Sequence, residues 1–327
     1  MVIDNENFLE GLIKLRKVIS SPYLLLVLAA LFWGGNFSVG KALVSVMPPV
    51  TMSTIRWSVS FLLFLPLAYR DVSNNKETLR RNWKAVLGLA VTGIAMFNAL
   101  AYLSMEYTTS INASLMNAMA PVVIVVLSVI YLKDRFNAVQ LSGILLSIAG
   151  VIWIITRGDI SRIIHFSFNP GDLIMVVAVS AWGAYSVMMK KFGGRLPGRG
   201  TFLLTMLVGI ICLLPFTVYE LITLESPLVL EPLNYLQLAY ISVFPSVLAF
   251  LCWNKGLLAV GPSKASVYLN LIVVFVALFG IIFLDERLYS FQIIGGILVV
   301  AGVYLSNRAG MKKASVSRRG IKRASHL

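Results

Sequence analysis

The chain has 327 residues, of which 58% are hydrophobic and 13% are charged, and its mean hydropathy is +0.84. A soluble domain of this length carries more charge, so the composition excludes a soluble globular protein and indicates an integral membrane protein. The net charge of +14 is explained by basic loops beside a membrane, and nucleic-acid binding is only a remote alternative.

Ten segments of the chain are long and apolar enough to cross a bilayer as helices, which takes about 20 mostly apolar residues each. Turn and charge signals separate them, among them Pro48-Pro49 and the basic run 70–84. The first apolar segment begins near Pro22 and is long enough to span, so we predict an uncleaved helix there rather than a signal peptide. The ten predicted helices cover residues 22–45, 50–69, 84–104, 109–132, 138–156, 170–190, 201–223, 235–256, 262–284 and 289–307.

The two halves of the sequence are copies of each other. Residues 130–151 match the second half at an offset of 152 residues, with identical pairs such as Arg135 and Arg287. The front of each half matches at an offset of 149 residues, as for Trp33 and Trp182. The change of offset places a three-residue length difference between the second and third helices, where a loop tolerates it. The chain is therefore a duplication.

Five helices per half is an odd number, so the second half must cross the membrane in the opposite sense from the first. With the N-terminus in the cytoplasm, 23 of the 28 Lys and Arg residues fall on the cytoplasmic side, as the positive-inside rule requires. We therefore predict an all-α integral membrane protein with ten transmembrane helices in two inverted five-helix repeats and both termini in the cytoplasm. Its parts are a cytoplasmic N-terminal segment (1–21), the first repeat (22–157), an external connector (158–169), the second repeat (170–307) and a basic cytoplasmic tail (308–327).

Several short motifs resemble the drug/metabolite transporter superfamily, in its EamA-like branch of ten helices. They are Trp33-Gly34-Gly35-Asn36-Phe37 with Lys41, then Arg56, Pro121, Trp253-Asn254-Lys255-Gly256, Gly261-Pro262-Ser263-Lys264-Ala265-Ser266 and Leu284-Asp285-Glu286-Arg287. The resemblance implies a carrier in a bacterial-type inner membrane that moves small organic solutes and commonly exports amino acids or metabolites. Val273 occupies the position in the second half that corresponds to Pro121, so the sequence does not predict whether the ninth helix is kinked.

In an inverted-repeat carrier the solute site lies near the middle of the membrane between the repeats, and rocking of the halves gives alternating access. Trp33 and Asn36 are three residues apart and share a helix face, as do Trp182 and Tyr185 at the matching positions. The first and sixth helices are therefore the predicted walls of the cavity. The further polar candidates are Asn98, Tyr102, Asn112, Asn117, Asn254, Tyr268 and Asn270. Close packing between helices is the alternative role for each of them.

Two cations are predicted near the outer ends of the first two helices. Lys41 and Arg56 flank the Pro48-Pro49 turn, and Glu106 is predicted at the outer end of the third helix. We expect the two cations to form an electropositive mouth that attracts anionic solutes. The alternative is that both side chains extend to the membrane interface.

The sequence contains no catalytic or cofactor motif. His-Glu-x-x-His, Gly-x-Ser-x-Gly and the phosphate-binding loop of ATPases are absent, and the two cysteines lie in apolar spans without metal-ligand spacing. We therefore expect no enzyme activity, no cofactor and no metal site. The acidic residues nearest the spans all lie at span ends, so a passive facilitator and a proton antiporter are both open. A membrane sensor or structural protein without transport is the third alternative.

The predicted partners are a small-molecule solute and the lipid bilayer, and the basic tail is a candidate for contact with anionic lipid. Gly143, Gly150, Gly295 and Gly302 have the spacing of small-residue packing motifs. We therefore predict close helix packing at these glycines, and homodimer contacts are the alternative.

Overall fold

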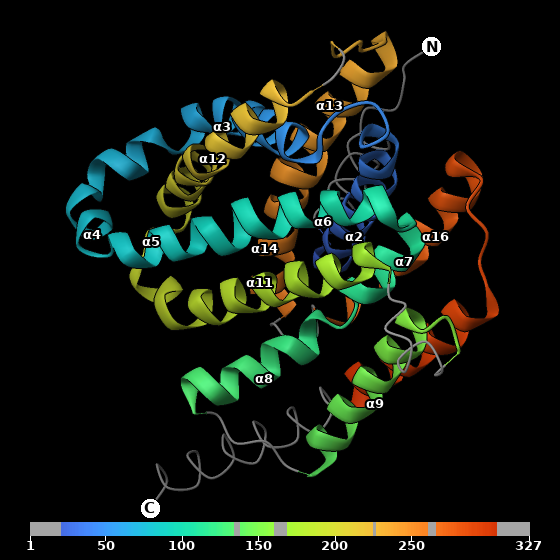
Figure 1. The fold of residues 1–327 in the computed structure, drawn as a ribbon. Coiled ribbons are helices and arrows are strands. Elements are labelled where there is room, and N and C mark those ends of the chain that lie inside the picture. Colours follow the sequence, from blue (N-terminus) through green and yellow to red (C-terminus); the bar gives the residue numbers. More distant parts are fainter. Residues whose placement is uncertain (1–20, 134–137, 160–168, 225–226, 261–265, 306–327) are drawn as a thin grey trace, which may run out of the picture.

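The structure is a computed structural model that describes residues 21–133, 138–159, 169–224, 227–260 and 266–305. Within these ranges all regular secondary structure is helical, and Figure 1 shows the helices packed in a bundle. The all-α prediction is thus confirmed. The predicted N-terminal segment, most of the connector and the basic tail lie outside the described residues.

The first repeat contains five apolar helical segments, two of which are interrupted. The third segment consists of two α-helices joined by a π-helical segment, and the fourth is split into two helices. A short helix in the loop precedes the third segment. In chain order the helices are α2 (Pro22–Leu43), α3 (Pro49–Asn74), α4 (Lys76–Arg81), α5 (Trp83–Leu89), η1 (Ala90–Met96), α6 (Phe97–Tyr107), α7 (Ser110–Asn117), α8 (Ala120–Leu132) and α9 (Ala138–Ile155).

The second repeat follows the same plan. Its third segment again contains a π-helical stretch, and its fourth begins with a 3₁₀ turn. The helices are α11 (Pro170–Phe192), η2 (Gly193–Arg195), α12 (Gly198–Ile222), α13 (Pro232–Val243), η3 (Phe244–Leu248), α14 (Ala249–Val260), η4 (Ser266–Asn270), α16 (Leu271–Leu284) and a last helix, Ser290–Leu305.

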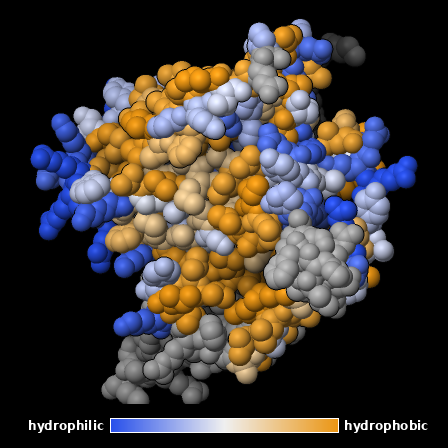
Figure 2. All heavy atoms as spheres, in the orientation of Figure 1, coloured by the Kyte–Doolittle hydropathy of each residue, from blue (hydrophilic) through white to orange (hydrophobic). Residues whose placement is uncertain are grey.

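The outer surface of the bundle is apolar. In the described part of the chain seven helices are long and apolar enough to cross a membrane, and three shorter apolar helices, Leu141–Ile155, Tyr268–Leu284 and Ser290–Leu305, complete the ten predicted segments. On α12, Phe216 is 62% exposed and Ile222 is 78% exposed. Figure 2 shows hydrophobic side chains across the middle of one face, with hydrophilic groups toward its two sides. Lipid must cover such a surface, so the chain is a multi-pass membrane protein.

The two repeats run in opposite directions through the bundle. The second helices of the repeats, α3 and α12, lie side by side in Figure 1. Glu220 near the end of α12 contacts Val50 at the start of α3, and Gly200 at the start of α12 lies against Asp71 near the end of α3. Equivalent helices are therefore antiparallel, as an inverted duplication requires.

The interruptions in the helices follow the 152-residue offset. The π-helical segments η1 and η3 occupy matching stretches of the two third helices. The fourth helix of the first repeat breaks after Asn117, and in the second repeat the change from η4 to α16 falls at the matching place, after Asn270. In the second half the helix changes there from 3₁₀ to α without a gap, although Val273 replaces the proline, so the change of helix type needs no proline. Lys133 and Asp285, also 152 residues apart, both adopt a left-handed backbone conformation, with φ of 56° and 51°.

The fifth and tenth helices pack through glycines, as the sequence predicts. A Cβ atom on Gly150 would lie 2.7 Å from the carbonyl oxygen of Gly295, and one on Gly302 would lie 2.5 Å from that of Gly143. The backbones of α9 and of the helix Ser290–Leu305 therefore touch. These four glycines join the two repeats within one chain.

Two carboxylates of the second repeat cap helix N-termini of the first repeat. Glu220 accepts hydrogen bonds from the backbone nitrogens of Val50 (3.0 Å) and Thr51 (2.6 Å) at the start of α3. Glu286 accepts from the backbone nitrogens of Ser110 (2.7 Å) and Ile111 (3.0 Å) at the start of α7. Each carboxylate satisfies donors that a helix leaves unpaired and faces the positive end of its dipole.

We expect Glu286→Gln to lower the stability of the protein by about 1–2 kcal/mol, because an amide has one acceptor oxygen and no charge to bind two backbone N–H groups. The measurement is the thermal midpoint of the purified protein in detergent. Glu77→Gln, at an exposed carboxylate in the first turn of the short helix α4, is the control and should lower the midpoint by less. Equal midpoints for the two variants would show that the cap contributes nothing.

Candidate functional site

A cavity of about 130 Å³ lies between the two repeats. Both π-helical segments, the break after Asn117 and the junction of η4 with α16 contribute to its wall. Irregular backbone inside a membrane protein is tolerated where it is buried or lines a cavity, and transporters place such segments at their solute sites. The lining residues from the first repeat are Trp33, Asn36, Phe37, Arg56, Trp57, Gly93, Ile94, Phe97, Asn98, Ser114, Asn117, Ala118, Ala120 and Pro121. Those from the second repeat are Trp182, Tyr185, Phe202, Pro245, Ser246, Phe250, Leu269, Asn270, Ile272 and Val273.

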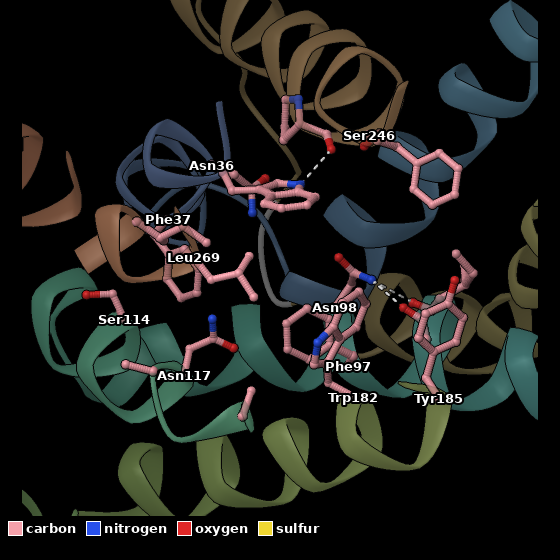
Figure 3. A pocket seen from close by; sticks show the side chains of 18 of the residues that line it. Asn36, Phe37, Phe97, Asn98, Ser114, Asn117, Trp182, Tyr185, Ser246 and Leu269 are labelled. Atoms are coloured by element: carbon pink, nitrogen blue, oxygen red, sulfur yellow. Dashed lines mark hydrogen bonds between the residues drawn. The ribbon is translucent and has the colours of Figure 1, made fainter. Parts of the chain in front are cut away.

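The π-helical segment η1 determines how Asn98 is oriented. A wider turn leaves backbone carbonyls without their usual α-helical partners. The side-chain amide nitrogen of Asn98 donates to the carbonyls of Gly93 (2.9 Å) and Ile94 (3.3 Å), as the dashed lines in Figure 3 show. The amide oxygen of Asn98 is then directed toward Arg56, from which it accepts a hydrogen bond of 3.0 Å.

Arg56 is a buried cation in the wall of the cavity. Its side chain is only 3% exposed, and it lies seven residues into α3, roughly 10 Å from the start of that helix. Its Nε donates to the hydroxyl of Ser246 (2.6 Å), and its Nη1 donates to Asn98 and to the hydroxyl of Tyr102 (2.5 Å). The guanidinium also lies 5.0 Å from the ring centre of Trp57. Arg56 therefore links the first repeat to Ser246 in the second.

The rest of the wall is largely aromatic. Trp182 packs between Phe97 and Tyr185, with ring centres 4.9 Å and 5.0 Å apart, and its ring is nearly parallel to that of Tyr185. Trp33 donates its indole N–H to the carbonyl of Pro245 in η3 at 3.0 Å. In Figure 3, Trp182 and Tyr185 lie on one side of the space and Asn117 lies on the other, beside Ser114 and Leu269.

Most of the residues that the sequence suggested for a solute site lie in this wall. Tyr102 stands behind the lining and links Arg56 to Asn36, whose amide oxygen accepts from the Tyr102 hydroxyl at 2.8 Å. The side chain of Asn254 lies outside the described residues, and Tyr268 packs near Tyr23, with ring centres 6.2 Å apart. The predicted residues that line the cavity are Trp33, Asn36, Arg56, Asn98, Asn117, Trp182, Tyr185 and Asn270.

The predicted mouth formed by Lys41 and Arg56 is wrong, because the two cations line different pockets. Arg56 belongs to the cavity between the repeats and does not extend to the interface, since it bonds to three side chains. Lys41 lies in a second pocket with Glu106, and its ammonium donates to the carbonyl of Met105 at the end of α6. Lys41 lies near the end of α2 and Arg56 lies about two turns into α3, although both flank the same turn in the sequence.

The second pocket adjoins a buried carboxylate that sequence reasoning assigned only to a span end. Asp172 is 1% exposed. It accepts hydrogen bonds from the Thr108 hydroxyl at 2.9 Å and the Asn112 amide at 2.6 Å. These contacts join the corner between α6 and α7 to the start of α11, so Asp172 also bridges the repeats.

Ser246 was missed because a serine in an apolar helix is an unremarkable signal. The duplication offers a way to find it, since Ser246 lies 152 residues after Ile94, in the matching π-helical segment. No comparable signal in the sequence marks Trp57 or Phe202 as lining residues.

Comparison with known proteins agrees with this architecture. Residues 20–156 and 169–308 each match the EamA-like transporter family. The chain is 30% identical over 284 residues to the uncharacterized transporter YyaM of Bacillus subtilis (strain 168), which covers 86% of this chain and 92% of that protein. It is 29% identical over 292 residues to an uncharacterized transporter of Archaeoglobus fulgidus, covering 88% of this chain and 97% of the other.

A solved crystal structure superposes on the chain with a TM-score of 0.58 and 17% sequence identity, covering 87% of this chain and 96% of that one. This similarity shows the same fold. The match of both repeats and the similarity to the bacterial and archaeal transporters along most of their length identify a membrane transporter and not an enzyme. The chain belongs to the EamA-like transporter family.

Proposed function

We propose that this protein is a secondary transporter of the cytoplasmic membrane that exports small organic solutes, such as amino acids or related metabolites, by alternating access. The observation that carries the proposal is the cavity between the repeats. It combines a fixed cation, several amide groups and stacked aromatic rings, which is the mixture of apolar walls and a few placed polar groups that small-molecule sites use.

The contacts between the repeats support alternating access. At one end of the bundle, Glu220 and Glu286 of the second repeat bind the starts of α3 and α7 in the first repeat. Opening the cavity toward that end by rocking one repeat against the other would break these bonds. In the proposed mechanism these bonds hold the repeats together at that end until the cavity opens there.

The proposed orientation places the Glu220 and Glu286 end outside the cell. Arg80 and Arg81 of α4 follow the end of α3, and Arg195 precedes the start of α12. These basic residues therefore lie at the end of the bundle opposite Glu220. Positively charged loops remain in the cytoplasm. Both termini are then cytoplasmic, and export is the direction that the family resemblance favours.

The test is flux in proteoliposomes with a mixed pool of amino acids and small metabolites, with and without an imposed pH gradient. We expect a subset of the pool to cross only in vesicles that contain the protein. Flux driven uphill by the pH gradient would establish proton coupling, whereas flux that follows only the solute gradient would establish a facilitator. Folded, reconstituted protein that moves no member of the pool would contradict the proposal and favour a sensor.

A further inference from the structure

We propose that the solute is a small monocarboxylate with a flat apolar body and a hydrogen-bond donor, and that its carboxylate binds the guanidinium of Arg56. This inference rests on the proposed function, because it names the class of solute that the cavity takes. Binding can be measured without flux, so the two proposals can fail separately.

The charge of the cavity requires an anion. Among the described residues that line it, Arg56 is the one charged group, and no Asp or Glu is present. Its partners Ser246, Asn98 and Tyr102 are neutral. A buried charge without a counter-ion is costly in a membrane protein, and ionisable groups retained there usually have a function. An anionic solute would supply the missing charge.

The guanidinium has donors left for that anion. The Nε and Nη1 groups are bonded to neighbouring side chains, and Nη2 has no acceptor within the described part of the chain. Three neighbours and the Trp57 ring hold the guanidinium in place, so little entropy remains to be lost on binding. A carboxylate matches the fork of Arg and its single charge. A phosphate ester carries about −1.5 to −2 and would leave negative charge unbalanced.

The aromatic residues in the cavity wall favour a flat, apolar group in the part of the solute other than its carboxylate. Phe97, Trp182 and Tyr185 form a continuous aromatic surface in the cavity wall. Trp33 also lines the cavity, and behind it Trp253 packs with a ring-centre distance of 5.5 Å. A flat apolar group packs against such rings with favourable edge and stacking contacts. An extended hydrophilic body would leave its polar groups unpaired against the same walls.

Asn117 adds a further requirement. Its amide oxygen is buried and has no hydrogen-bond partner in the described residues. Figure 3 shows the Asn117 side chain on the side of the cavity away from Trp182 and Tyr185. A buried acceptor without a partner is costly, so a solute that donates an N–H or O–H there is favoured.

The test compares two probes of nearly the same size and shape, 4-hydroxyphenylacetate and 4-hydroxyphenylacetamide, of which only the first is an anion. Both have a ring and a hydroxyl donor, and binding is measured by calorimetry and by the rise in thermal midpoint of the purified protein. We expect the acid to bind about 10- to 100-fold more tightly than the amide, as charge-assisted hydrogen bonds imply. Arg56→Gln should abolish the preference, and Arg70→Gln, which removes an exposed arginine of α3, should retain it.

Equal binding of acid and amide to the wild-type protein, or no binding of either, would overturn the inference. The comparison of acid and amide binding to the wild-type protein tests the inference even if Arg56→Gln does not fold. Acid-selective binding without flux of any carboxylate would support the site and contradict the transport proposal. Flux of neutral solutes by a protein that shows no preference for the acid would support the transport proposal and contradict the carboxylate site.

Discussion

Gly302→Val should abolish accumulation of folded protein. A Cβ atom at this position would lie 2.5 Å from the Gly143 carbonyl oxygen and 2.5 Å from the Ser147 nitrogen. Both atoms belong to the backbone of α9, so no side-chain rotation relieves the clash. The two helices must move apart, and we expect a loss of about 3 kcal/mol or more, at the upper end for overpacked interiors. The measurement is the yield of monodisperse protein after extraction in detergent.

Ala301→Val is the matched control for Gly302→Val. Ala301 is the adjacent residue on the same helix and is exposed at the surface of the bundle, so the two methyl groups added there meet lipid or detergent. We expect its yield to equal that of the wild type. Normal yield and unchanged thermal midpoint for Gly302→Val would show that the contact between the fifth and tenth helices does not hold the repeats together.

Asp172→Leu should destabilise the protein by roughly 2–5 kcal/mol, because it removes the carboxylate oxygen that accepts from the buried Thr108 hydroxyl and Asn112 amide. Asp172→Asn should cost less, since both bonds go to one carboxylate oxygen and the amide oxygen of asparagine can still accept them. The thermal midpoints of the two variants give the comparison. Leu173→Ala, at an exposed neighbour, is the control for the position. Identical midpoints for Asp172→Leu and Asp172→Asn would contradict the hydrogen-bond explanation.

The Asp172→Asn variant also tests whether Asp172 binds a coupling proton. Asp172 is a buried carboxylate that joins the repeats, whereas Glu106 is exposed. If transport proves to be driven by a pH gradient, we expect Asp172→Asn to retain flux down the solute gradient and to lose the uphill component. Uphill flux that survives in Asp172→Asn would exclude this carboxylate as the coupling group.

The carboxylates at the helix ends show how far sequence reasoning reaches. The charged turn 285–287 is visible in the sequence as a break between two apolar segments, and that reading is sufficient to place the ninth and tenth helices. Its role as a cap is not visible, because Glu286 binds Ser110, which lies 176 residues away along the chain. Only the packing of the two repeats brings the carboxylate to that helix end.

Arg56 shows the same limit within the candidate site. Sequence position puts it beside the Pro48-Pro49 turn and suggests a shared mouth with Lys41, yet the structure places it among Asn98, Tyr102 and Ser246. The direction in which a helical side chain points depends on the rotation of the helix against its neighbours. That rotation is set by packing between helices that are distant in the sequence.

By itself the sequence determined that this is a helical membrane protein, where its ten apolar segments lie and that its halves form an inverted duplication. It could do so because a bilayer allows a buried backbone few alternatives to the helix, so length and hydrophobicity alone define the segments. The tertiary structure decided which residues share the cavity, where the helices are interrupted and that Asp172 and Arg56 are buried. These features depend on contacts between the two repeats, which no local pattern of residues records.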